Sequence, residues 1–207
     1  MPDNPIIPIF PLNLVVLPTE LRPLHIFEER YKAMVAYCRD SGVSFGISPN
    51  ADGTVCHVGC TVEITRITHK YPDGRLDMLT VGRRRYTMKE AFQDLPYMTA
   101  AVEFFDDEAE VPEPGLLERT AKRRSKLFEL MGEPGWSLEE EDPPATSFGM
   151  AQGVQCTLNF KRKLLESTSE NMRLMVLCEY FDRMILDTAE HRETLNRARS
   201  NGKPKSL

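Results

Sequence analysis

The sequence predicts an α+β protein: an antiparallel β-barrel subdomain followed by an α-helical subdomain. About six short segments rich in β-branched and aromatic residues occupy the first half at hairpin spacing. Prolines and acidic residues at 111–115 then mark a boundary, after which apolar residues recur at helical spacing. We therefore expect a barrel over residues 1–110 with one helix near 27–40, a helical subdomain over 111–200 and a disordered tail over 201–207.

Residues 8–40 organise the first half. The apolar run 9–17 is bounded by prolines and predicts a buried strand, while Pro11, which lacks an N–H, suits a sheet edge or a bulge. A second extended piece starts at Pro23. From Phe27 the apolar residues recur every three or four positions, which predicts an amphipathic helix that stops at Gly42.

The remaining strands are expected between clear turn signals. Residues 48–53 and 71–75 are the two turns, the latter with the sequence Tyr-Pro-Asp-Gly-Arg. The segment between them predicts one long, bent strand, with a bulge between Ile64 and Ile67 where the alternation breaks. Further strands are expected over residues 43–47, 76–81 and 97–105.

Helical patterning dominates the second half. One helix is predicted to end before Gly132, and residues 133–144 are expected to form a surface loop. Residues 148–159 and 160–166 suit short helices. Ser167 to Glu170 then offers an N-cap for a last helix, whose apolar stripe fades after residue 189 and whose end should be exposed.

The composition limits the classes of function that the protein can have. A net charge of −5 over 207 residues argues against a dedicated nucleic-acid binder. The first ten residues do not read as a secretory signal, and we see no transmembrane segment, so we expect a bacterial-type cytoplasmic protein without membrane association. Five cysteines, an odd number, are read as reduced thiols.

Several separated motifs resemble the amino-terminal, substrate-recognition domain of Lon proteases. They are FPL-x-x-VVLP-x-x-x-x-PLHIFE-x-RY at residues 10–31, VG-x-x-VEI from residue 58, PDGRLD from residue 72 and VGRRRY from residue 81. The resemblance is specific in the first half of the chain. It implies a PUA-like β-barrel subdomain followed by a helical subdomain, and a role in binding polypeptide.

The sequence carries no catalytic set that we would assign. The Gly-Lys pair at 202–203 precedes a proline rather than the hydroxyl residue of a Walker loop, and Ser125-Lys126 would point in different directions on a helix. Neither the ATPase nor the Ser-Lys peptidase signature of a full Lon protease is recognised. We expect no enzyme activity and no cofactor.

Two clusters suggest alternatives. Cys56, His57 and Cys60 contain zinc-ligand types, but a strand would direct His57 away from the two thiols, so structural cysteines are the preferred interpretation and no metal is expected. Arg83, Arg84 and Arg85 stand before Tyr86, a basic and aromatic grouping that would suit RNA. On a strand, one of these arginine stems should be buried and the others solvated.

The sequence thus favours a stand-alone, non-catalytic module that binds unfolded or degron-bearing polypeptide or a partner protein. Candidate contact residues are Phe10, Pro23, Phe27 and Tyr31, expected in a cleft between barrel and helices, although each can equally belong to the core. A PUA-like RNA-binding module, a small enzyme on the same scaffold and an adaptor with one obligate partner remain alternatives.

Overall fold

The computed structural model describes residues 4–51, 53–132 and 146–201. The expected loop at 133–144 and residues 202–207 of the expected tail lie outside the described residues. The chain divides into two compact units, the first formed by residues 1–108 with Val154–Thr168 and the second by Ala109–Gly153 with the chain from Ser169 onward. Residues 154–168 therefore group with the strands, although the sequence pattern grouped them with the helices. The predicted domain bounds stay a prediction.

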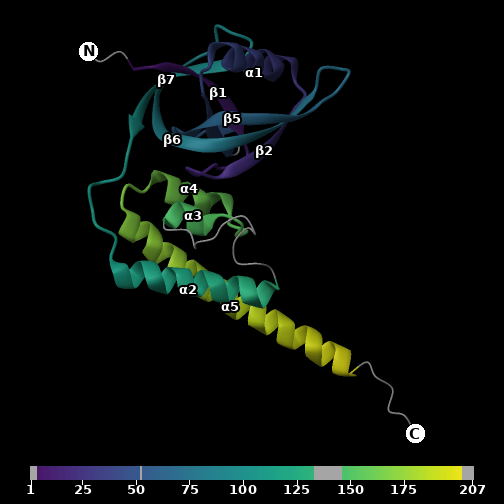
Figure 1. Ribbon diagram of the computed structural model, residues 1–207, viewed down its shortest axis with the longest axis vertical. Coiled ribbons are helices and arrows are strands. Elements are labelled where there is room, and N and C mark those ends of the chain that lie inside the picture. The colour runs from purple at the N-terminus through teal and green to yellow at the C-terminus, as the bar shows by residue number, and fades with distance from the viewer. Residues whose placement is uncertain (1–3, 52, 133–145, 202–207) are drawn as a thin grey trace. The chain divides into compact units, whose positions relative to one another are not determined.

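The first unit contains the sheet and two helices (Figure 1). Its elements are β1 (Ile6–Leu12), β2 (Leu21–Ile26), α1 (Glu29–Ser41), β3 (Phe45–Ala51), β4 (Thr54–Val55), β5 (Val58–Lys70), β6 (Leu76–Phe92), β7 (Met98–Phe105) and α4 (Leu158–Glu166). The predicted α+β class is confirmed. The turn signal at 48–53 predicted a hairpin or a longer loop, and a short hairpin of β3 with β4 is present, although β3 continues through Ala51 into the predicted turn.

The strand pairings close into a ring in the order β1, β7, β6, β5, β3 and back to β1. The β1–β3 pairing is parallel, with Ile9 opposite Gly46, whereas the other pairings in the ring are antiparallel. The predicted antiparallel sheet thus contains one parallel pairing, which the sequence did not predict. The physical reason is the long crossover through β2 and α1, which a parallel pair requires.

Strand β6 serves two partners along one of its edges. Residues 76–81 pair with β2 and residues 85–92 pair with β7, while β5 runs along the other edge. Gly82 lies at the change of partner, where its N–H donates to the carbonyl of Glu20 over 2.9 Å. A Cβ at this position would overlap the carbonyl of Leu17, so only glycine fits.

The one long strand predicted between the two turns is divided into β4 and β5, because residues 56 and 57 belong to neither strand, but the predicted bulge and hairpin of β5 are present. Register shifts separate Ile64 from Arg66 and Ile67 from His69, and they confirm the expected bulge. The turn predicted at 71–75 is closed by a hydrogen bond from the N–H of Tyr71 to the carbonyl of Arg75, with Gly74 at a φ of 84°. Local chemistry therefore sets this hairpin.

Helix α1 packs on the sheet through the apolar face that the sequence predicted. Tyr31, Met34, Val35 and Cys38 are buried in one cluster with residues of β1, β2, β3, β5 and β6. Gly42 ends the helix in the left-handed conformation, with a φ of 68°, as expected. Phe27 precedes the helix and does not join this buried face.

The second unit consists of helices: α2 (Pro114–Met131), α3 (Ser147–Ala151) and α5 (Glu170–Asn201), with α2 and α5 side by side in Figure 1. Gly132 ends α2 as predicted. Ser169 caps α5 by accepting a hydrogen bond from the N–H of Met172 over 3.1 Å. The expected helix over 148–159 is wrong, because α3 ends at Ala151.

Two buried arginines hold the second unit together. Arg124 donates to the carbonyls of Met150 and Gln152, at 3.0 and 3.1 Å. Arg173, fully buried, donates to the Glu170 carboxylate over 2.6 Å and to the Ser147 hydroxyl over 2.8 Å. These bonds tie α3 to α2 and α5, because a buried guanidinium must satisfy its donors within the protein.

Tyr86 fills the first unit next to the β1–β3 pairing. Its side chain is fully buried, and its Oη lies 2.8 Å from the Ser48 hydroxyl. Burial raises the pKa of this phenol. A Cβ on either Gly46 or Gly59 would overlap the Tyr86 ring end, so both glycines make room for it.

Gly59→Ala should therefore destabilise the protein by about 2–3 kcal/mol, because the methyl group overpacks a site with no free volume. Denaturant unfolding followed by circular dichroism measures the effect. Gly115→Ala, where an added Cβ meets nothing within 4 Å, is the matched control and should leave the midpoint unchanged or raise it slightly, because Gly115 lies in α2 and alanine is the better helix former. Equal midpoints for the two variants would show that the site has room.

Candidate functional site

A pocket of about 370 Å³ opens in the first unit beside the start of α1. Its size is within the range of roughly 300–1,000 Å³ that is typical of ligand sites. Three of the four contact residues predicted from the sequence, Phe10, Phe27 and Tyr31, line it. The complete lining is Phe10, Pro11, Leu12, His25, Ile26, Phe27, Glu28, Arg30, Tyr31, Asn50 and Val55.

The three aromatic residues differ in exposure. Phe10 and Tyr31 are 5% and 7% exposed and form a packed pair, with ring centroids 4.1 Å apart. Burial is also the main cause of the raised pKa of the Tyr31 hydroxyl. Phe27 is 59% exposed. The pocket thus combines a fixed aromatic wall, which belongs to the core, with one large apolar side chain that water still reaches.

Pro23, the fourth predicted residue, lies elsewhere. It is exposed and lines a second hollow of about 270 Å³, together with Leu24, His25, Arg66, Thr68, Asp77, Met78 and Leu79. His25 is the residue that lines both hollows. The structure therefore brings Phe10, Phe27 and Tyr31 into one site and leaves Pro23 on a neighbouring one.

The polar groups of the first pocket are few. Arg30 pairs with Glu28 at 2.7 Å, and its guanidinium lies over the Tyr31 ring, 4.6 Å from the centroid. Asn50 presents a buried Oδ1 that has no hydrogen-bond donor among the described residues. A buried acceptor without a donor costs about 1–3 kcal/mol of stability.

A polar cluster lies beside the second hollow. His25 Nδ1 is 2.5 Å from one oxygen of Asp77, and the Tyr71 hydroxyl donates to the other over 2.8 Å. The bond from His25, followed by that from Tyr71, lowers the pKa of the Asp77 carboxyl. His25 also stacks on Phe27, with ring centroids 5.9 Å apart. The cluster thus fixes the imidazole next to the exposed aromatic ring.

Sequence reasoning missed His25 and Asn50. The histidines looked scattered along the chain, and His25 meets Asp77 only through the register of β2 on β6. Asn50 was read as part of a turn, whereas β3 carries it to the pocket. The turn at 71–75 could have predicted that His69 faces Asp77, but no local signal fixes the register of β2.

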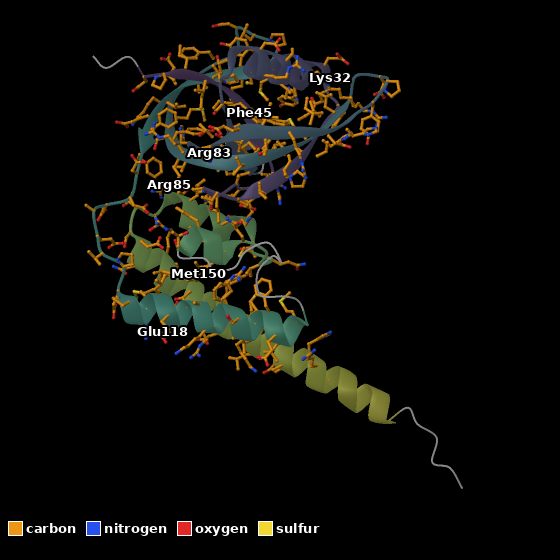
Figure 2. The ribbon with its side chains drawn as sticks, viewed as in Figure 1. Lys32, Phe45, Arg83, Arg85, Glu118 and Met150 are labelled. Atoms are coloured by element: carbon orange, nitrogen blue, oxygen red, sulfur yellow. The ribbon has the colours of Figure 1, made fainter. Side chains whose placement is uncertain are left out.

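One arginine of the cluster is buried and the other two are exposed, as the sequence predicted. Arg83 and Arg85 both lie on β6 (Figure 2). Arg85 is 4% exposed; it donates to the carbonyls of Leu165 and Ser167 and forms an ion pair with Asp107. It therefore ties β6 to the end of α4.

The two solvated members of the cluster also lie next to carboxylates. Arg83 pairs with Glu63 at 2.8 Å, and Arg84 lies 3.9 Å from Asp106. Each of the three arginines thus has an acidic partner, which lowers the local positive potential that a phosphate backbone would require.

The three residues of the cysteine cluster do not share one strand as predicted: Cys60 lies in β5, whereas Cys56 and His57 lie between β4 and β5. Cys60 is buried, its thiol donates to the carbonyl of Thr61 over 3.4 Å, and burial raises its pKa to about 12. Cys56 is half-buried, with its Sγ 3.9 Å from a guanidinium nitrogen of Arg162. Within residues 4–51, 53–132 and 146–201, no group of three or more His, Cys, Asp or Glu is arranged to hold a metal ion.

None of the helices in the described part of the chain is both long and apolar enough to span a membrane.

Comparison with solved structures defines the class of the protein. The Lon N-terminal domain protein from Xanthomonas campestris is 25% identical, with a TM-score of 0.66 over 85% of this chain and 98% of that one. The N-terminal domain of Mycobacterium avium complex Lon protease gives the same TM-score at 20% identity, over 86% and 98% of the two chains. The fold is thus that of a Lon N-terminal domain.

The family model described as the ATP-dependent protease La (LON) substrate-binding domain matches residues 6–183. The chain belongs to this family. The match extends through α4 and well into α5, so it includes the half of the chain in which the sequence showed no more than helical patterning.

Arg85→Met should destabilise the protein by about 3 kcal/mol, because it removes a buried guanidinium that bonds to the carbonyls of Leu165 and Ser167 and pairs with the carboxylate of Asp107. Arg84→Met, at the neighbouring exposed position, should change the stability by no more than about 0.5 kcal/mol. Urea unfolding of both variants is the measurement. Equal losses of stability in the two variants would mean that the buried contacts of Arg85 stabilise the protein no more than the exposed pair of Arg84.

Proposed function

We propose that this chain binds unfolded or degron-bearing polypeptide in the pocket around Phe27, without catalysing a reaction itself. The observation that carries the proposal is the exposed Phe27 ring beside the packed pair of Phe10 and Tyr31. The family description, substrate-binding domain, supports the same kind of partner.

The energetics of such a site are favourable. Covering a half-exposed aromatic side chain removes apolar surface from water, which contributes about 1.5–3 kcal/mol for a fully buried phenylalanine. Phe10 and Tyr31 are already held by the core, so little conformational entropy is lost on their side when a ligand binds.

The alternatives receive less support. The pairing of Arg83, Arg84 and Arg85 with carboxylates disfavours an RNA-binding surface. His25 and Asp77 resemble part of a catalytic pair, but both side chains are more than 30% exposed, which favours a positioning role beside Phe27. We propose that the protein acts in the cytoplasm. The stand-alone arrangement, the site between the two subdomains and the single-partner adaptor stay predictions.

The first test is binding of the purified protein to reduced, carboxymethylated α-lactalbumin, which is permanently unfolded, and to single-stranded RNA, each at two salt concentrations. We expect saturable polypeptide binding that tolerates salt, because apolar burial is weakly screened. Steeply salt-dependent RNA binding without polypeptide binding would contradict the proposal.

Phe27→Ala should weaken the binding of that polypeptide about tenfold, because the site loses most of its exposed apolar surface. Tyr37→Ala is the matched control: Tyr37, on α1, is also an exposed aromatic residue, at 51%, but does not line the pocket. Fluorescence anisotropy of the labelled polypeptide measures both affinities. A loss of similar size in the two variants would mean that the contact is not at this pocket.

A further inference from the structure

Strand β2 has one free edge. In the described part of the chain, β6 is the strand that pairs with β2, through an unbroken antiparallel register from Leu21 opposite Val81 to Ile26 opposite Leu76. The neighbouring strands of the ring each pair on both sides over part of their length. An unpaired edge offers a row of backbone donors and acceptors to another extended chain.

The residues that present these groups can be identified. The N–H of Gly82 donates to the carbonyl of Glu20, just before β2, so this N–H points toward the β2 side of β6. The reciprocal bond is displaced by one residue, since the Gly82 carbonyl accepts from the N–H of Thr19. Counted from the Gly82 N–H, the even-numbered residues of β6 and their partners in β2 form the hydrogen-bonded pairs. In an antiparallel ladder such pairs alternate. The even-numbered residues, Arg22 and Leu24 among them, therefore face β6, and the odd-numbered residues face outward.

Two further observations agree with this assignment of even-numbered residues to the β6 side and odd-numbered residues to the free edge. The Thr80 hydroxyl donates to the carbonyl of Arg22 over 2.9 Å, which directs that carbonyl toward β6. Pro23, which has no N–H to donate, occupies an outward position, so the hydrogen bonds between β2 and β6 lose no donor. The free edge thus presents the N–H and C=O groups of Leu21 and His25 and the C=O of Pro23.

Both hollows lie along this strand. The pocket around Phe27 includes His25 and Ile26, and the second hollow includes Pro23, Leu24 and His25. Exposed apolar side chains stand at both ends of β2: Leu21, its first residue, is 56% exposed, and Phe27, directly after its last residue, is 59% exposed. The backbone edge and the apolar surface therefore adjoin each other, and an added strand would contact both.

We propose that the bound polypeptide adds to the free edge of β2 as an extended strand, pairing with the backbone of Leu21, Pro23 and His25. This inference rests on the proposed function and specifies how the polypeptide is bound. Successive side chains of a strand point to opposite faces, so alternate residues of the ligand reach the two hollows. The ligand class is an extended segment rich in β-branched and aromatic residues, of the kind that folding normally hides.

Amide hydrogen exchange of the whole protein tests this mode directly. With saturating carboxymethylated α-lactalbumin, the exchange of the Leu21 and His25 amides should slow at least about tenfold, because they gain hydrogen-bond partners. The amides of Arg22 and Leu24 are the internal control. They are already bonded to β6, so they should change much less.

Leu21→Pro removes one outward N–H and should weaken the binding several-fold, whereas Leu21→Ala keeps the N–H and reports on the side chain alone. The exchange measurement uses the natural sequence, so it decides the question even where Leu21→Pro does not fold. Binding that depends on Phe27 without protection of Leu21 and His25 would overturn strand addition and leave the proposed function standing. The absence of any polypeptide binding would overturn both.

Discussion

The first unit depends on one strand, β6, being shared between two partners along a single edge. Residues 76–87 of this 17-residue strand pair with β5 on one side, while β2 and β7 divide the other side between them. The change of partner requires Gly82, because the chain at Leu17 approaches so closely that a side chain would not fit. Closure of the ring through β1 and β3 follows from the same division, since β7 carries the sheet onward to β1.

The division of β6 has a second consequence, which concerns β2. Because β7 and β1 complete the ring elsewhere, no strand in the described part of the chain pairs with the outer edge of β2. The same segment carries His25 and leads into Phe27, so the site and the free edge share their residues. Here the sheet topology, rather than a dedicated loop, creates the surface to which we assign binding.

Sequence reasoning reached the features that local chemistry fixes. The turn at 71–75, the bulge after Ile64 and the end of α1 at Gly42 each follow from the residue types present. It failed where distant segments meet. The parallel register of β1 on β3 and the meeting of His25 with Asp77 depend on tertiary packing that no local pattern records.

The candidate contact residues show the same limit. Phe10, Phe27 and Tyr31 were selected together from one motif-rich stretch, and they do line one pocket. Their division into a buried pair and one exposed ring was not predictable, because it depends on where α1 begins relative to β2: the helix begins at Glu29, and Phe27 falls in the connection before it.

Pro23 disfavours aggregation through the free edge of β2. A free edge with every donor in place would pair with the same edge of a second copy. In a symmetric antiparallel pairing centred on β2, Pro23 would lie near the middle of both strands, and each copy would lack its central donor. A foreign segment can choose a register in which Leu21 and His25 supply the bonds. The edge therefore favours transient binding of other chains over self-association.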